Sequence, residues 1–169
     1  MLVIFNPVAG RRRATALWRV LDLLVENGVK IEVAETQHAG HATDLARQAA
    51  REGAFMVVAA GGDGTIAEVA NGLIGTDTAL GIIPLGTANV LAKEYGLSTH
   101  PRGIANTLAY KRCKPLWPGV AQLPGRACVR ADAGAGLRWR GGEGCAAAAQ
   151  ARHRQGGLCL AVGLGIRGL

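Results

Sequence analysis

The stretch that most constrains this chain is a buried strand that runs into a glycine-rich turn. Residues 55–60 are apolar, and the sequence G-G-D-G-T follows at residues 61–65. Apolar residues then recur at helical spacing from residue 66 onward, so the turn joins a strand to a helix. Glycines let backbone N–H groups crowd around an anion, and the helix N-terminus adds a favourable dipole. We therefore predict that this turn binds phosphate.

Strand-like and helix-like segments alternate along most of the chain. Short apolar or alternating runs predict strands at residues 2–5, 29–34, 55–60, 79–84 and 114–120. Helical spacing marks residues 14–27, 42–53, 66–75, 90–95 and 101–110. This alternation predicts an α/β fold, with a Rossmann-like parallel sheet in three layers and helices on both of its faces.

Four turns are expected to meet at one edge of that sheet. Asn6-Pro7 follows the first strand, Thr36 the second, G-G-D-G-T the third, and L-G-T-A-N at residues 85–89 the fourth. Ligands of parallel α/β sheets bind beyond the carboxyl ends of the strands. The convergence of four such turns favours a ligand site more strongly than any one of them alone.

A purely structural interpretation of the glycine turn is also open. The glycines could simply connect strand to helix, and Asp63 could be the N-cap of the helix. An N-cap, however, requires neither two glycines before it nor Gly64-Thr65 after it. Thr65 and Glu68 also place polar groups on the first turns of the helix, beside its positive pole. We therefore favour the phosphate interpretation.

The motifs and their order resemble one family of kinases. G-G-D-G-T at residues 61–65 and P-L-G-T-A-N at residues 84–89 resemble the catalytic domain of diacylglycerol and sphingosine kinases, and of bacterial lipid kinases in particular. N-P-x-x-G at residues 6–10 and T-x-x-x-G-H-A at residues 36–42 match two further motifs of that family. NAD kinases share the first turn, and phosphofructokinases have a related one, but they lack P-L-G-T-A-N in this place.

The resemblance implies a set of ATP contacts, with Mg²⁺ beside the phosphates and Asp63 ordering the turn or helping to hold the metal. The implied contacts are Asn6, Pro7, Val8, Ala9, Gly10, Thr36, Gly62, Asp63, Gly64, Thr65, Ile66, Ala67, Glu68 and Thr87. The metal ligands themselves do not follow from the sequence. The family often carries Asp after the Asn of the second turn, and Val90 here removes one possible polar contact. His41 matches a family motif, and we expect it to cap or pack rather than to catalyse.

Composition excludes several other classes of function. The net charge of +7 arises mainly after residue 120, and the basic cluster at residues 11–13 lacks interleaved aromatic residues, so we expect no nucleic-acid binding. The four cysteines form no C-x-x-C pair, which argues against a zinc site and suits a reduced compartment. No apolar run is long enough to span a membrane. We expect a cytoplasmic protein, with peripheral association at the inner membrane face.

The chain changes character after about residue 120, so we divide it into a nucleotide-binding domain, residues 1–120, and a tail, residues 121–169. The tail is rich in Arg, Gly and Ala, and we expect it to be irregular. In the family a second domain begins here and supplies the lipid pocket and a catalytic acidic residue. Residues 137–144 and 154–159 can each be encoded so that one neighbouring reading frame gives family-like strings. We therefore hypothesise a frameshifted remnant of that domain, which the DNA sequence around codon 120 would decide.

The leading hypothesis is the nucleotide-binding half of an ATP-dependent kinase. In the intact enzyme it would transfer the γ-phosphate of ATP to a hydroxyl of diacylglycerol or a sphingoid lipid at a membrane surface. We expect the general base to be absent from this chain and its activity to be weak or missing. The alternatives are an NAD kinase-like small-molecule kinase and a module that binds ATP without turnover. The sequence names neither the lipid nor the oligomeric state.

Overall fold

The computed structural model describes residues 1–10, 14–110, 113–116, 120–123, 126–129 and 158–161. Its core is a parallel sheet of four strands, joined by helices that cover both faces. The strands are β1 (Leu2–Phe5), β2 (Glu32–Glu35), β3 (Met56–Gly61) and β4 (Ala79–Pro84). The helices are α1 (Pro7–Gly10), α2 (Ala14–Glu26), α3 (His41–Arg51), α4 (Asp63–Leu73), α5 (Val90–Glu94) and α6 (Pro101–Ala109). The predicted fold class is confirmed.

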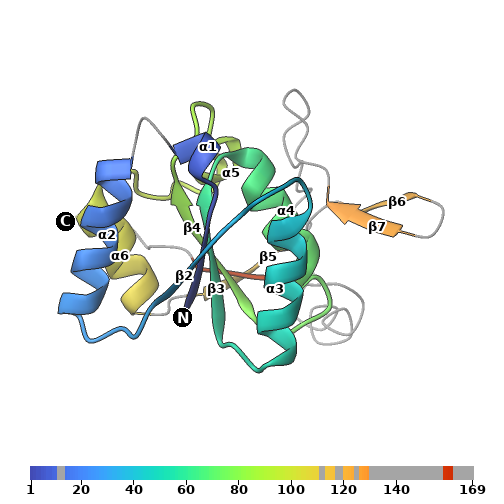
Figure 1. Cartoon of the computed structure of the whole chain (residues 1–169), viewed down its shortest axis with the longest axis horizontal. Helices are drawn as coiled ribbons and strands as arrows, with labels where there is room; N and C mark the ends of the chain where they lie inside the picture. The colour runs from blue at the N-terminus through green and yellow to red at the C-terminus, as the bar shows by residue number, and fades with distance from the viewer. Residues whose placement is uncertain (11–13, 111–112, 117–119, 124–125, 130–157, 162–169) are drawn as a thin grey trace, which may run out of the picture.

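Strand order in the main sheet is β2-β1-β3-β4-β8-β5, with β1 to β4 all parallel. β3 and β4 lie in the middle and are buried along their whole length. That burial explains their continuous apolar sequences, since a parallel strand covered by helices on both faces has no polar side. The carboxyl ends of all four parallel strands therefore point to one edge (Figure 1).

Two separate hydrophobic clusters flank the sheet. On one face α3 and α4 pack against the sheet through small and branched residues such as Ala46, Val69 and Leu73. On the other face α2 and α6 pack side by side, with Leu17, Leu24 and Leu108 in the core (Figure 1). The helices thus form the outer two layers of a three-layer sandwich.

The approach of α3 to α4 depends on a glycine. A Cβ placed on Gly72 would lie 2.5 Å from the carbonyl oxygen of Thr43 and 2.7 Å from Cβ of Ala46. Thr43 also donates its hydroxyl to the carbonyl of Glu68 over 2.9 Å. The two helices therefore touch at the backbone level, which fixes the direction in which α4 leaves its glycine turn.

The second strand starts later than predicted. The alternation of residues 29–34 predicts a strand there, whereas β2 spans Glu32–Glu35. The paired register begins at Leu2↔Glu32. Before it, the N-terminal ammonium of Met1 donates to the carbonyl of Lys30 over 2.9 Å, and the carbonyl of Met1 accepts the N–H of Glu32 over 3.0 Å. Val29 and Ile31 instead pack as loop residues against the α2 side of the core. Of the last predicted strand, residues 114–120, the structure describes β5 (Cys113–Leu116) and Val120, which begins a separate strand, and residues 117–119 lie outside the described part.

The expected irregular tail needs correction at three short segments. β6 (Val120–Leu123) and β7 (Arg126–Val129) form an antiparallel pair, and β8 (Leu158–Ala161) joins the main sheet between β4 and β5. The apolar sequence of β8 suits the open edge of β4, whose backbone groups need partners. The other tail residues, including most of those that motivate the frameshift hypothesis, lie outside the described part of the chain.

Candidate nucleotide site

The predicted phosphate turn connects β3 to α4. Gly62 is the N-cap of α4, in an extended conformation, and it makes no side-chain capping hydrogen bond. The first helical bond runs from the N–H of Ile66 to the carbonyl of Gly62, over 3.1 Å. The N–H groups of Asp63, Gly64 and Thr65 come before that bond and have no partner within the helix. The sequence thus leaves the positive end of α4 uncapped and able to bind an anion.

A second glycine turn, after β4, lies directly against the first. The N–H groups of Leu85 and Gly86 both donate to the carbonyl of Gly61, over 2.9 and 3.2 Å. A Cβ placed on Gly86 would lie 2.6 Å from Cα of Gly62. The two turns therefore touch through their backbones, and any side chain at residue 86 would separate them.

Asp63 ties the same two turns together. Its Oδ1 accepts a hydrogen bond from the backbone N–H of Val90 over 2.8 Å. The sequence suggested that Val90 removes a polar contact at this turn, but the backbone of Val90 supplies one. This bond joins Asp63 to the second turn, and the residue is partly exposed.

Asn89 shapes the second turn from inside. It is a non-glycine residue in the left-handed region, with φ 47°, and it is only 3% exposed. Its Nδ2 donates to the carbonyl of Gly86 over 2.7 Å. Its buried Oδ1 has no hydrogen-bond partner among the described residues. A buried amide held in a strained conformation indicates that the shape of this turn is closely specified.

The first and third predicted turns are also joined. Asn6 follows β1, donates its backbone N–H to the carbonyl of Ala60, and donates Nδ2 to the hydroxyl of Thr65 over 3.2 Å. Its Oδ1 accepts the N–H of Val8 over 3.0 Å, which holds the start of α1. Asn6 therefore links the N-P-x-x-G segment to the first turn of α4.

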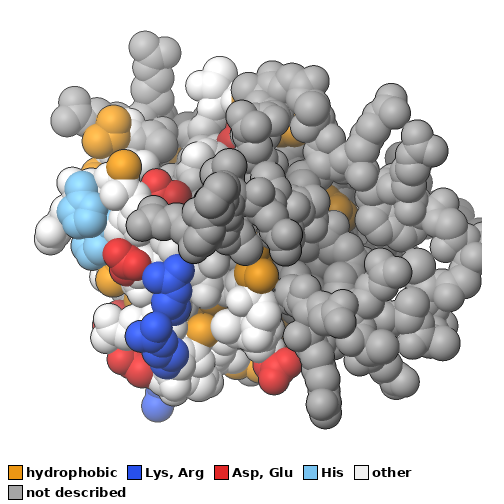
Figure 2. Space-filling view, turned by 90° about the vertical axis from the view of Figure 1, so that its right-hand side faces the viewer, with side chains coloured by type: hydrophobic (Ala, Val, Ile, Leu, Met, Phe, Trp, Pro, Cys, Tyr) orange, Lys and Arg blue, Asp and Glu red, His pale blue; other side chains and the backbone are white. Residues whose placement is uncertain are grey.

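Thr36 reaches the same edge from β2. Its backbone N–H donates to the carbonyl of Phe5 over 2.9 Å, so Thr36 lies beside the end of β1. The following loop carries His38, whose ring stacks on that of His41, the first residue of α3, with centroids 4.9 Å apart. Figure 2 shows histidine side chains at the surface on the α3 side of the molecule, with basic and acidic side chains mixed below them.

The structure brings the predicted residues together with differing exposure. Val8 is 78% exposed, Gly64 and Thr87 are exposed, and Ala67 and Glu68 are half-buried. Ile66 is 3% exposed and packs in the core, so its side chain supports the turn from below. The basic cluster at residues 11–13 lies outside the described residues, and of Ala9 and Gly10 only the backbone in α1 is described.

Electrostatics at the edge rest on few groups. Among the described residues, no three His, Cys, Asp or Glu side chains gather as a ready-made metal site. That arrangement still suits Mg²⁺, which usually keeps several waters and binds through one or two carboxylates and the phosphates of a substrate. Near the site, burial raises the pKa of Tyr95, and the charge of Glu94 adds to the effect.

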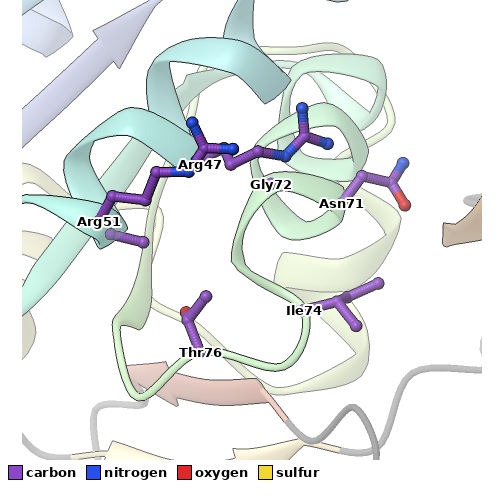
Figure 3. A pocket seen from close by; sticks show the side chains of 7 residues that line it. Arg47, Arg51, Asn71, Gly72, Ile74 and Thr76 are labelled. Carbon is purple, nitrogen blue, oxygen red and sulfur yellow. The ribbon is translucent and has the colours of Figure 1, made fainter.

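A separate pocket of about 450 Å³ lies at the far end of α3 and α4. Figure 3 shows its lining, in which Arg47 and Arg51 extend across the groove toward Asn71. Arg47 pairs with Asp44 over 3.2 Å, and Arg51 occupies the last turn of α3. Arg51 complements the negative end of α3, whereas Arg47 lies in the middle of that helix. The pocket is thus distinct from the edge where the glycine turns meet.

The fold and the site define an α/β domain with two interlocked glycine turns at the carboxyl edge of its sheet. The sequence model of the diacylglycerol kinase catalytic domain matches residues 1–119. The chain belongs to the diacylglycerol kinase catalytic domain family.

Individual relatives agree with this assignment. The chain is 41% identical over 98 residues to a diacylglycerol kinase of Bacillus subtilis, covering 56% of this chain and 32% of the relative. It is 46% identical over 85 residues to "Probable lipid kinase YegS" of Escherichia fergusonii, covering 48% of this chain and 28% of the relative. The chain thus spans about a third of the length of these relatives.

A solved structure gives the same result in three dimensions. A diacylglycerol kinase from Bacillus anthracis superposes with a TM-score of 0.60 at 28% identity, covering 68% of this chain and 43% of that one. Within the described residues, no helix is both long and apolar enough to cross a bilayer.

Proposed function

We propose that residues 1–120 form the ATP-binding half of a lipid kinase. The observation that carries the proposal is the uncapped N-terminus of α4, held against the second glycine turn. Three backbone N–H groups, at Asp63, Gly64 and Thr65, have no helical partner there. Phosphates of ATP would bind these donors, helped by the helix dipole and by the absence of side chains at Gly62 and Gly86.

The other residues of the site would orient the nucleotide. Asn6 holds the hydroxyl of Thr65. Thr36 follows β2 and Thr87 follows β4, on opposite sides of the turns after β1 and β3, and their hydroxyls would donate to phosphate or ribose oxygens. Asp63, fixed by Val90, would place its second oxygen toward Mg²⁺ or a water bound to it. Bound Mg²⁺ would neutralise charge on the phosphates, since phosphoryl transfer depends mainly on positioning and charge stabilisation.

The acceptor in the intact enzyme would be a hydroxyl of diacylglycerol or of a sphingoid lipid at the inner membrane face. The names of the relatives and the matched family support a lipid acceptor. The general base is not among the predicted site residues, so we expect this chain to bind ATP with little or no turnover. A module that binds ATP without turnover is therefore the second candidate.

The test uses one position at the site and two side chains of the same shape. A Cβ at Gly64 meets no atom within 4 Å, so the fold should tolerate Gly64→Asp and Gly64→Asn alike. The aspartate places a negative charge where the phosphates would bind, and we expect it to weaken ATP·Mg²⁺ binding about tenfold or more. The isosteric Gly64→Asn isolates the effect of charge from that of size.

Calorimetric titration with ATP·Mg²⁺ and a phosphorylation assay with diacylglycerol vesicles should be run on the same samples. Binding without turnover supports the ATP-binding module, and binding with turnover supports the complete lipid kinase. Absence of ATP binding by the folded wild-type chain, or equal binding by Gly64→Asp, would refute the site.

A further inference from the structure

The loop between β2 and α3 is fastened by a histidine side chain. The backbone N–H of Gln37 donates to Nδ1 of His41 over 3.1 Å. His41 is the first residue of α3, and Gln37 follows Thr36 at the nucleotide edge. This hydrogen bond therefore joins the start of the loop, at Gln37, to the first residue of α3, where the loop ends.

α3 depends on this closure because it has no side-chain cap of its own. Its N-cap is Gly40, in the left-handed region with φ 85°, and no side chain caps the helix. The backbone bond from His41 N–H to the carbonyl of His38 is long, at 3.3 Å. The ring of His41 is thus a principal support of a loop that is otherwise weakly held.

The same bond fixes the backbone beside Thr36. The N–H of Thr36 donates to the carbonyl of Phe5, at the end of β1, over 2.9 Å. The next N–H, that of Gln37, is held by His41 from the other side. Two successive peptide groups are therefore tied to two different elements, which leaves little freedom for the Thr36 side chain between them.

We propose that His41 is a positioning residue of the nucleotide site. Its imidazole is neutral, with the proton on Nε2, so that Nδ1 accepts the Gln37 N–H and presents Thr36 to the nucleotide. The inference rests on the proposed function for its link to ATP. The state of the ring can be tested without any ligand.

The surroundings of the ring agree with a neutral imidazole. Only a neutral ring has an acceptor nitrogen, because both nitrogens of a protonated ring carry hydrogen. The ring of His38 stacks on it, with an interplanar angle of 19°. The acidic groups on the adjoining elements are Glu35 on β2, Asp44 on α3, which pairs with Arg47, and Glu68 on α4.

Three variants separate the acceptor from the rest of the ring. In His41→Asn the side-chain oxygen takes the place of Nδ1 along the chain and keeps an acceptor there. His41→Ala removes the acceptor, and His38→Ala removes the stacking while leaving the acceptor. We expect wild-type ATP·Mg²⁺ affinity for His41→Asn and His38→Ala, and a loss of roughly two- to tenfold for His41→Ala.

The ligand-free readout is the ¹⁵N spectrum of the His41 ring together with hydrogen exchange at Gln37. The proposal requires an unprotonated Nδ1 near neutral pH and faster Gln37 exchange in His41→Ala than in His41→Asn. It is overturned if Nδ1 carries the proton, if His41→Asn binds ATP as weakly as His41→Ala, or if His38→Ala shows the same loss. If neither the wild type nor any variant binds ATP, but Nδ1 of His41 is unprotonated, the proposed function is refuted. The hydrogen bond that closes the loop is then still supported.

Discussion

The contact between the two glycine turns gives the sharpest prediction, because a single methyl group tests it. In Gly86→Ala the new Cβ would lie 2.6 Å from Cα of Gly62 and 3.0 Å from Oδ1 of Asn89. Ordinary contact begins at about 3.4 Å, so the turns must separate by about 0.8 Å. The Gly62 atom belongs to the backbone and cannot rotate away as a side chain would.

The energetic consequence follows from what that separation breaks. The bonds from Leu85 and Gly86 to the carbonyl of Gly61, and from Val90 to Asp63, all span the same gap. We expect a loss of about 1–3 kcal/mol in the free energy of unfolding, which is the usual cost of an overpacked site. ATP·Mg²⁺ affinity should fall as well, because the phosphate turn loses its support.

Urea unfolding followed by circular dichroism measures the stability of Gly86→Ala against wild type. The matched control is Gly64→Ala, in which the new methyl group meets no atom within 4 Å and lies inside the helix. That control should be neutral or slightly stabilising, since Ala favours a helix over Gly by up to about 1 kcal/mol. A Gly86→Ala protein as stable as Gly64→Ala would show that the turns do not touch as described.

Three further predictions concern other contacts of the domain. Asp63→Ala should lower the free energy of unfolding by about 0.5–1.5 kcal/mol, because it removes the hydrogen bond from Val90. Asp63→Asn should keep this stability yet weaken ATP·Mg²⁺ binding. Equal effects of the two variants on urea unfolding would contradict the hydrogen bond. Gly72→Ala should lower the free energy of unfolding by about 1–3 kcal/mol in the same assay, because its methyl group would meet Thr43 and Ala46 of α3. A decrease under ~0.5 kcal/mol would argue against the close contact between α3 and α4. Burial raises the pKa of Tyr95 above its ordinary value of about 10, so its contribution to stability is complete below that pH and is lost as pH rises through the raised pKa. Tyr95→Phe should therefore lose less stability than wild type when urea midpoints are compared at pH about 9 and about 11, and equal losses would refute the stated cause.

Much of the fold could be predicted because the central strands are buried on both faces. The uniform apolar character of residues 79–84 marks β4 with its bounds unchanged, and β3 is displaced by a single residue. The second strand was placed too early because alternation alone cannot show where its partner begins. Val29 and Ile31 alternate like strand residues, yet the paired register begins at Leu2↔Glu32, and both residues pack against the α2 side of the core.

The site was predicted in composition but not in its internal contacts. The motifs place Asn6, Thr36, Asp63 and Thr87 at one edge, and the structure brings all four turns there. The bond of Asp63 to Val90 and the contact of Gly62 with Gly86 join residues more than twenty positions apart. No periodicity signals such contacts, since they arise only when the strands pair.

For a related reason, the sequence does not show the structural roles of two residues of the site. The motif contains Asn89 but does not indicate its left-handed conformation, although Asn adopts that region more often than most residues do. The capping or packing role expected for His41 agrees with its hydrogen bond to Gln37. The sequence does not show that Gln37 is the partner, because this depends on the path of the loop.

The bond that Asp63 receives comes from a peptide group, and this affects how the family can vary. Every amino acid except proline offers the same N–H, so residue 90 can change its side chain freely without releasing Asp63. A proline is the one replacement at residue 90 that would remove this link, because it has no backbone N–H.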